Sequence, residues 1–228
     1  TADGLEVELK LSVEDPEAIR KLVRRPTPSA LAGFRPDGRT RKVEVVDRYL
    51  DTADGSLDTA TARVRLRQVG RRTVATFKRR GVDDGDITAR VEIEGPATPS
   101  LDPRRWPDSP ARRALLEVTG GAPLVETARL RQRRLVRNVR RGETRVELSL
   151  DELEALDGDR VVASRWELEA ELKAGHREDL RELANALATT PGLGLPYGQK
   201  RLFAMLSVAA ARAAASAESE STGRQSDR

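Results

Sequence analysis

Carboxylates and a lysine alternate with aliphatic residues near both ends of this chain. Glu6, Glu8 and Lys10 occupy every second position at the start, and Glu167 and Glu169 repeat the spacing late in the sequence. Alternate residues of a β-strand project from the same face, so each set would form a charged row. Neighbouring carboxylates on one face repel each other unless a cation lies between them. That cation could come from the solvent with its salt, or it could be a bound divalent metal ion.

Basic residues follow the same alternation on stretches between these rows. Arg65 and Arg67 share one parity of the strand expected over 62–69, and Lys78 lies on the returning strand over 73–80. Guanidinium groups bind phosphate oxygens in a bidentate manner, and ammonium groups bind them as point charges. Carboxylates hold the divalent cation that accompanies a phosphate chain. Such residues could hydrolyse a phosphoanhydride, because the metal acidifies water and the basic groups neutralise charge on the transferred phosphoryl group.

The composition excludes several other kinds of active site. The 228 residues contain no cysteine and one histidine, His176, which we expect at the surface at a helix start. A cysteine nucleophile, a thiolate metal site and a disulfide are therefore absent, and a histidine zinc site or a Ser-His-Asp triad is not supported. The 41 basic and 37 acidic residues leave a net charge of only +4, so the chain is not a polycation.

The length and the run of elements predict one domain over residues 1–208. Residues 209–228 have no hydrophobic periodicity and are expected to form a disordered tail. No apolar run is long enough to span a bilayer and no secretory signal is visible, so we expect no membrane partner. Together with the absence of cysteine, this favours a cytoplasmic location.

Period-two patterns predict about eight strands in two runs. The strands are expected over 4–11, 42–51, 62–69, 73–80, 87–95, 127–139, 144–151 and 161–172. Helices are expected around Ile19, from Pro110 to the Gly120 stop, over 176–187 and over 199–211. Hairpin connections make the sheet antiparallel, and about eight strands are enough to close a small barrel.

Two arrangements of the alternating charges compete. In a sandwich, every charged face points to solvent and the aliphatic faces form a common core. In a barrel with the charged face inward, the helices around Ile19, Leu115, Leu183 and Phe203 cover an apolar outer face. The second arrangement is favoured because the signs are sorted by strand, whereas a solvated surface usually mixes them. We therefore predict an α+β fold, a closed antiparallel β-barrel or tunnel of about eight strands with helices packed outside.

In these patterns the chain resembles the CYTH proteins, also called triphosphate tunnel metalloenzymes. Glu6, Glu8 and Lys10 are similar to the ExExK signature of that family. The order of the later residues strengthens the resemblance, and these are Arg65 and Arg67, Lys78, Arg90 with Glu92 and Glu94, Arg131 and Arg133, Asp151, Glu167 and Glu169, and Lys200. Gln199 stands where serine is common in the family. The arginines at 129, 131, 133 and 134 offer several registers, of which Arg133 is preferred.

The resemblance implies a tunnel barrel with Mg²⁺- or Mn²⁺-dependent triphosphatase activity. The catalytic residues it implies are Glu6, Glu8 and Lys10. The implied phosphate-binding residues are Lys10, Arg65, Arg67, Lys78, Arg90, Arg131, Arg133 and Lys200. The implied metal ligands are Glu6, Glu8, Glu167 and Glu169, with Glu92 and Asp151 as additions. The partner would be a small anionic substrate, either triphosphate, polyphosphate or a nucleoside triphosphate.

Inorganic triphosphate or short polyphosphate is the favoured substrate, because aromatic platforms for a base or a thiazole ring are scarce. The chain has three Phe, two Tyr and two Trp residues, and we expect Trp166 in the outer core and Trp106 as a loop anchor. A class IV adenylate cyclase and a thiamine triphosphatase are the alternatives within the family. A polyphosphate-binding module without catalysis is the alternative that is not an enzyme, although it would not need the carboxylates. The arginine-rich run over 129–141 lacks interleaved aromatics, so no nucleic-acid partner is expected. The protein would act as a monomer or homodimer.

Overall fold

The computed structural model describes residues 5–79, 82–84, 87–196 and 198–226, without the side chains of 5–6, 79, 82–84, 87–91 and 218–226. It has five α-helices and ten strands in these residues. The helices are α1 (Pro16–Arg24), α2 (Ser56–Thr59), α3 (Pro110–Thr119), α4 (Arg177–Ala188) and α5 (Lys200–Ser226), with a 3-10 helix at Pro103–Arg105. The strands are β1 (Leu5–Val13), β2 (Arg35–Thr52), β3 (Ala62–Val69), β4 (Arg72–Arg79), β5 (Val82–Asp84), β6 (Ile87–Pro96), β7 (Leu124–Arg141), β8 (Thr144–Asp157), β9 (Arg160–Ala174) and β10 (Leu193–Gly194).

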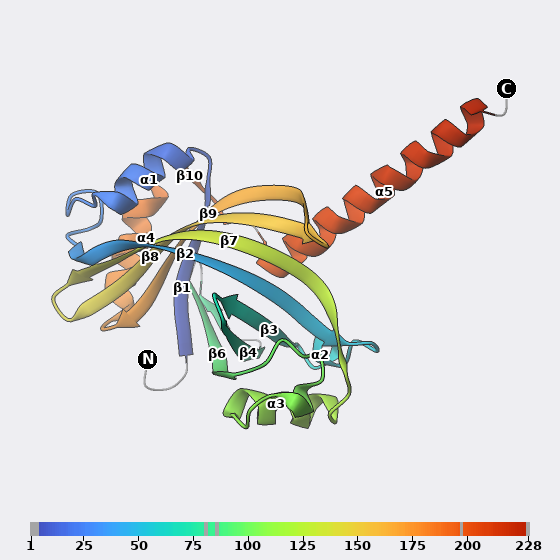
Figure 1. Ribbon diagram of the computed structural model, residues 1–228. Coiled ribbons are helices and arrows are strands. Elements are labelled where there is room, and N and C mark those ends of the chain that lie inside the picture. Colours follow the sequence, from blue (N-terminus) through green and yellow to red (C-terminus); the bar gives the residue numbers. More distant parts are fainter. Residues whose placement is uncertain (1–4, 80–81, 85–86, 197, 227–228) are drawn as a thin grey trace.

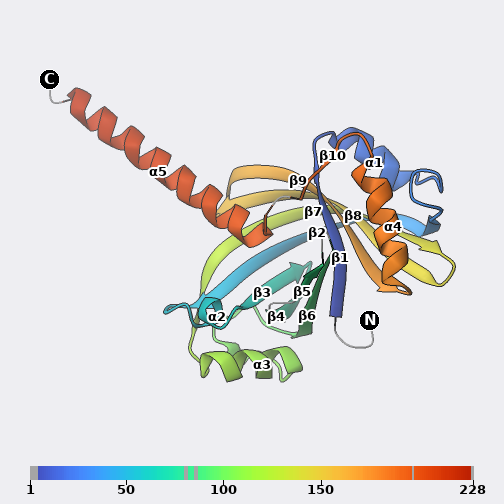
Figure 2. The same ribbon diagram turned by 180° about the vertical axis from the view of Figure 1, so that it is seen from behind.

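All ten strands join one antiparallel sheet in the order β10-β1-β9-β8-β7-β2-β3-β4-β6-β5. The strand β1 pairs with β9 through Glu8–Ser12, and it also pairs with β6 through Leu5–Leu9. Figure 2 shows β1 between β9 and β6, at the place where the two sides of the curled sheet approach each other. The predicted antiparallel α+β architecture is therefore confirmed, with eight long strands and the two short additions β5 and β10.

Several strands are longer than the alternation indicates. The strand β2 starts at Arg35 rather than near Lys42, and β8 continues past Asp151 to Asp157. Both extensions pair with β7, an 18-residue strand in the middle of the sheet. Pro36 and the polar residues around it weaken the period-two signal in the β2 extension, whereas pairing with a long neighbour satisfies the backbone groups of both extensions.

The aliphatic face of the sheet lies outside and is covered by helices, as predicted. One core joins β1, β7, β8 and β9 to α1 and α4, and includes the fully buried side chains of Ile19, Leu148 and Leu183. A second core places Phe77 and Leu66 of the β3–β4 hairpin against Leu115 of α3. Figure 1 shows α1 and α4 at one end of the sheet and α3 at the other.

Local capping fixes where the covering helices start and end. The Asp15 carboxylate accepts from the backbone N–H groups of Glu17 and Ala18 at 3.1 and 3.0 Å, at the start of α1. Ser109 caps α3 in the same way, accepting from the Arg112 N–H at 3.2 Å. Gly120 ends α3 with a positive φ of 60°, a conformation that costs glycine little.

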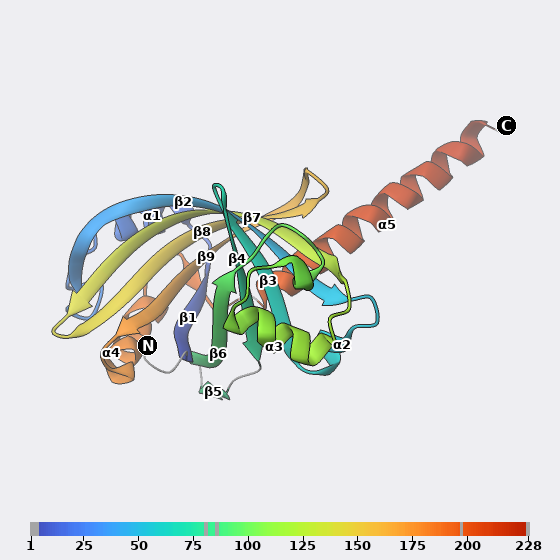
Figure 3. The ribbon, with the colours of Figure 1, turned by 60° about the horizontal axis from the view of Figure 1, so that its bottom comes forward.

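The position of α5 differs from the prediction that it covers the outer face. Phe203, Ala204 and Met205 pack on Ala128, Leu130 and Ala155 of β7 and β8. Leu130 lies directly opposite Asp47 in the β2–β7 ladder, on the face that carries the charged side chains. The first turns of α5 therefore close one end of the inner face, and Figure 3 shows the rest of the helix projecting away from the sheet. No helix in the described part of the chain is long and apolar enough to cross a membrane.

Shortening Leu115 to alanine should destabilise the protein by about 2–5 kcal/mol, because the cavity lies in the fully buried α3 core. The free energy of unfolding from urea titration measures this loss. Leu202→Ala is the matched control, since Leu202 is 49% exposed, and it should change stability by less than about 0.5 kcal/mol. Equal losses for the two variants would contradict the assignment of the α3 core.

Candidate functional site

The inner face of the sheet carries a cluster of acidic side chains around Lys10. The Lys10 Nζ atom lies 2.8 Å from Glu8 Oε1 and 3.1 Å from Glu169 Oε1. Both carboxylates are buried, with Glu8 5% and Glu169 9% exposed. Lys10 stands opposite Glu169 in the β1–β9 ladder, so strand pairing itself brings the start and the end of the sequence together. Burial lowers the pKa of Lys10, but the charges of Glu169 and Glu8 outweigh it and raise the pKa well above the usual value.

A second lysine enters the same cluster from α5. The Lys200 Nζ atom donates to Asp151 Oδ2 and Gln132 Oε1, both at 2.9 Å, and lies 3.1 Å from Glu169 Oε1. Burial lowers the pKa of Lys200, yet Asp151 and Glu169 raise it above the ordinary value. The three acceptors match the three N–H donors of the ammonium group, which holds the head of this side chain in one place.

Arg134 of β7 completes the pairing of these carboxylates. Its Nε donates to Asp151 Oδ1 and its second nitrogen donates to Glu169 Oε2, each at 2.9 Å. Burial alone would raise the pKa of Glu169, but Lys10, Lys200 and Arg134 together hold it well below the usual range. Glu169 is therefore ionised and lies at the centre of three cations.

A basic group faces this cluster from β3 and β4. The Arg67 guanidinium binds the Asp47 carboxylate of β2 in a bidentate manner, with N–O distances of 2.8 and 2.7 Å, and Arg65 lies 3.5 Å from the same carboxylate. Asp47 is completely buried. Burial raises the pKa of its carboxyl group, but the charges of Arg65 and Arg67 hold that pKa far below the usual value.

Lys78 and Glu92 extend the basic group towards β6. The Lys78 Nζ atom lies 2.9 Å from Glu92 Oε2, and Arg65 lies 3.7 Å from Glu92 Oε1. Arg65 also donates to the hydroxyl of Thr76, which in turn donates to Glu94 at 3.0 Å. Glu92 is thus paired with two phosphate-binding candidates, Arg65 and Lys78.

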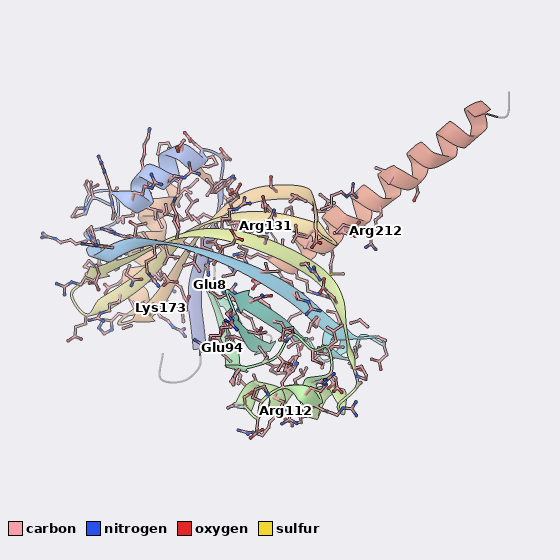
Figure 4. All side chains as sticks on the ribbon, viewed as in Figure 1. Glu8, Glu94, Arg112, Arg131, Lys173 and Arg212 are labelled. Atoms are coloured by element: carbon pink, nitrogen blue, oxygen red, sulfur yellow. The ribbon has the colours of Figure 1, made fainter. Side chains whose placement is uncertain are left out.

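The predicted placement of two arginines on the inner face is wrong. Arg131 lies 2.5 Å from Glu154, and Arg133 lies 3.0 Å from the same carboxylate on the outer side of the β7–β8 ladder. Figure 4 shows Arg131 above the arch of β2 and β7 and Glu8 beneath it. Leu130, on the inner parity, is buried against α5, and this burial turns the alternating arginines outward. Acidic partners also offset their charge, which removes the main argument for a nucleic-acid patch.

Three inner-face residues were missed or ranked too low from the sequence. Arg134 was one of several register choices, and Gln132 and Asp47 were not selected. Asp47 lies on the same face of β2 as Val45 and Tyr49. A single carboxylate among the apolar residues of one strand face was the signal in the sequence that could have identified it. Such a group requires a buried cationic partner, because burying it alone would be very costly.

Two predicted residues lie partly outside the described part of the chain. Glu6 and Arg90 stand opposite each other in the β1–β6 ladder, but their side chains are not described. Their roles remain predictions. The histidine prediction is confirmed, since His176 is exposed at the start of α4.

The acidic cluster has the donor chemistry of a divalent metal site. The Glu167 Oε2 atom is buried and accepts no hydrogen bond from the described residues, and burial raises the pKa of this carboxyl group. Among those residues, no three acidic or histidine side chains are arranged to hold an ion as they stand, because Lys10 and Lys200 lie between the carboxylates. Oxygen ligands of this kind suit hard cations such as Mg²⁺ and Mn²⁺.

Replacing Asp47 by asparagine should cost about 3–5 kcal/mol at pH 7, because it leaves two buried guanidinium groups without their carboxylate. The folded-state pKa of Asp47 is depressed, so its stabilisation is present above the unfolded pKa and is lost as the pH falls through the folded pKa. The stability difference from wild type should therefore shrink below about pH 4. Urea titrations from pH 3 to 7 measure it.

Asp159→Asn is the control for this experiment, because the Asp159 side chain is fully exposed. It should show no loss at any pH in the series. A constant difference between wild type and Asp47→Asn across the series would mean that the Asp47 charge does not stabilise the fold.

Comparison with known proteins agrees with this geometry. The model of the CYTH domain family matches residues 4–201. No curated protein matches the sequence significantly. A solved structure from Hippeastrum, described as a candidate adenylyl cyclase with a dominant triphosphatase activity, superimposes with a TM-score of 0.66 at 21% identity, covering 87% of this chain and 94% of its own.

A second solved structure shares the fold at lower similarity. It is a candidate adenylate cyclase from Bacillus halodurans, with a TM-score of 0.55 at 16% identity, covering 86% of this chain and 96% of its own. At these identities the two structures support the fold alone. The family model spans most of the sequence, and the chain therefore belongs to the CYTH domain family.

Proposed function

We propose that this protein is a metal-dependent triphosphatase that binds its substrate in a tunnel formed by the inner face of the sheet. The substrate would be inorganic triphosphate or a short polyphosphate. The observation that carries the proposal is that this one face holds both kinds of group such a substrate needs. The cations Arg65, Arg67 and Lys78 lie on one wall, and the carboxylates Glu8, Glu167 and Glu169 lie on the other. Family membership and the triphosphatase activity of the Hippeastrum protein support the same conclusion.

The buried charges are hard to explain by stability alone. Each ion pair on the inner face loses hydration, and well-packed apolar residues would often stabilise a fold as well or better. Pairing instead keeps the carboxylates and the basic side chains charged, so that each can bind an oppositely charged group of a substrate or a metal ion. A triphosphate can take the guanidinium and ammonium groups while a divalent cation takes the carboxylates, so the site exchanges one set of charge pairs for another.

Each group has a defined part in this proposal. Arg65, Arg67 and Lys78 bind phosphate oxygens from one wall, and Arg134 and Lys200 bind them from the other. Glu8, Glu167 and Glu169 would hold the metal, together with Glu6 as predicted from its place on β1. Lys10 lies between the carboxylates of Glu8 and Glu169, where it would orient both of them and bind the phosphate chain.

The chemistry follows from charge stabilisation. A bound Mg²⁺ or Mn²⁺ would position and acidify the attacking water and polarise the phosphoryl group. The arginines and lysines neutralise the charge that spreads over the transferred phosphoryl oxygens. Neither a histidine nor a cysteine is needed for this scheme. Asp151 and Glu92 remain candidate ligands, although each already pairs with a cation of the phosphate-binding set.

Neither tryptophan is placed to stack on an organic ring of a substrate. Trp166 packs on the outer core, and Trp106 is 3% exposed in the α3 core with its indole N–H donating to the Ser100 carbonyl oxygen. Both indoles therefore lie away from the inner face. A cytoplasmic location and a monomeric or dimeric state remain predictions.

Phosphate release from inorganic triphosphate is expected with Mg²⁺ or Mn²⁺ and should stop when a chelator is added. ATP, thiamine triphosphate and long polyphosphate should be hydrolysed more slowly, because neither indole is placed on the inner face to stack on a ring. A phosphate assay across these substrates and metals measures the preference. Release from none of them would refute the enzyme, and formation of cyclic AMP with pyrophosphate from ATP would identify a cyclase instead.

Neighbouring arginines on opposite faces give a second test of the site. Arg134→Ala should weaken triphosphate binding at least about tenfold, since a charged hydrogen-bonding partner is worth about 1.5–3 kcal/mol. Arg133→Ala should leave binding within about twofold of wild type, because its 47% exposed side chain points outward. Titration calorimetry with inorganic triphosphate measures both. A larger loss for Arg133→Ala would reverse the assignment of the faces.

A further inference from the structure

We infer that Gln132 is a positioning residue that holds the basic wall and the acidic cluster of the site in one fixed arrangement. This inference rests on the proposed function and identifies a neutral side chain as the link between its two halves. Gln132 lies on the inner face of β7 and is completely buried. It carries no charge, and no step assigned above requires it to touch the substrate.

The amide of Gln132 bridges two groups of opposite charge. Its Nε2 atom donates to Asp47 Oδ2, and its Oε1 atom accepts from Lys200 Nζ at 2.9 Å. Asp47 holds Arg65 and Arg67, whereas Lys200 binds Asp151 and lies beside Glu169. The hydrogen bonds therefore run without interruption from β3 through β2, β7 and α5 to β8 and β9.

The chemistry of an amide explains why this position suits glutamine. The orientation of the side chain is fixed, because turning the amide over would place its oxygen against the Asp47 carboxylate and its NH₂ against the Lys200 ammonium. A carboxylate here would repel Asp47, and a cation would repel Lys200. An aliphatic side chain would remove one of the two hydrogen bonds that Asp47 Oδ2 accepts, leaving only that from Arg67, and would leave one buried donor of Lys200 without a partner.

The consequence is a fixed spacing between cations that bind the same phosphate chain. Asp47 orients the guanidinium groups of Arg65 and Arg67 through its carboxylate. Gln132 fixes the position of Asp47 relative to Lys200, because its amide is hydrogen-bonded to both. Phosphates of a bound chain would be held by cations from both ends of this link. Loss of the link should weaken binding of the ground state and the transition state equally, which raises KM and leaves kcat nearly unchanged.

Gln132→Met removes both hydrogen bonds while keeping the length of the side chain. We expect KM for inorganic triphosphate to rise about tenfold and kcat to stay within about twofold of wild type. Gln68→Met is the matched control, because Gln68 is exposed on β3 and donates only to the Gly70 carbonyl oxygen among the described residues. It should leave both constants unchanged. Steady-state kinetics with saturating metal measures them, and titration calorimetry gives triphosphate affinity independently.

A double exchange tests the bridge itself. Gln132→Glu alone places two carboxylates together, and Asp47→Asn alone removes the charge behind the arginines, so each should raise KM. In the double variant, the new amide at position 47 can donate to a carboxylate at position 132 that still accepts from Lys200, and the net charge is that of wild type. KM of the double variant should therefore be lower than the product of the two single effects predicts. If Gln132→Met does not fold, this isosteric series supplies the answer.

The outcomes separate this inference from the function on which it rests. Metal-dependent hydrolysis by wild type, with a selective rise in KM for Gln132→Met, supports both. Hydrolysis by wild type with unchanged KM and triphosphate affinity in Gln132→Met overturns the positioning role alone. A lower kcat with unchanged KM would indicate only a loss of folded protein, and it also overturns that role. Absence of hydrolysis by wild type refutes the proposed function, and calorimetry then shows whether Gln132 still controls triphosphate binding.

Discussion

The requirement that every buried charge has a partner governs the structure of this protein. Asp47 and Glu169 are almost inaccessible to water, and each is ionised because several cations surround it. Lys10 and Lys200 in turn keep raised pKa values because carboxylates flank them. None of these side chains could be buried alone at an acceptable cost. The inner face is therefore a single network, and the strands that carry it must curl far enough for opposite signs to meet.

Apolar and charged side chains therefore lie mostly on opposite faces of the sheet. The helices α1, α3 and α4 cover the outer face, so the charged rows around Lys10 and Arg67 lie on the inner one. The helix α5 is the exception, because its first turns pack on the inner face around Leu130 and Ala155. This packing delivers Lys200 to the carboxylates of β8 and β9. One helix thus closes an end of the inner face and supplies a cation to the site.

The strand β7 illustrates how tertiary contacts choose between sequence registers. Its arginines at 129, 131 and 133 alternate regularly, and the alternation predicts that they share the functional face. The structure places Gln132 and Arg134 there instead, because Leu130 of the same parity is buried beneath α5. The outward-facing arginines form ion pairs with Glu126, Glu152 and Glu154. The sequence alone did not indicate these pairings. A period of two defines the two faces of a strand but does not state which one is inside.

The sequence by itself determined which strands carry acidic and which carry basic residues, the antiparallel α+β class, and the end of α3 at Gly120. It also placed Glu8, Lys10, Glu167 and Glu169 in one acidic group. Those features depend on local periodicity and on the chemistry of single residues, which a sequence states directly. Only the tertiary structure decided that Asp47 lies behind Arg65 and Arg67, that Gln132 meets Lys200, and that Arg134 replaces Arg133. These choices depend on contacts across 17 to 85 residues of chain. The helix α5, which buries Leu130 and supplies Lys200, packs from the far end of the sequence. A one-residue change of register turns a side chain from one face to the other, so only the assembled sheet could fix it.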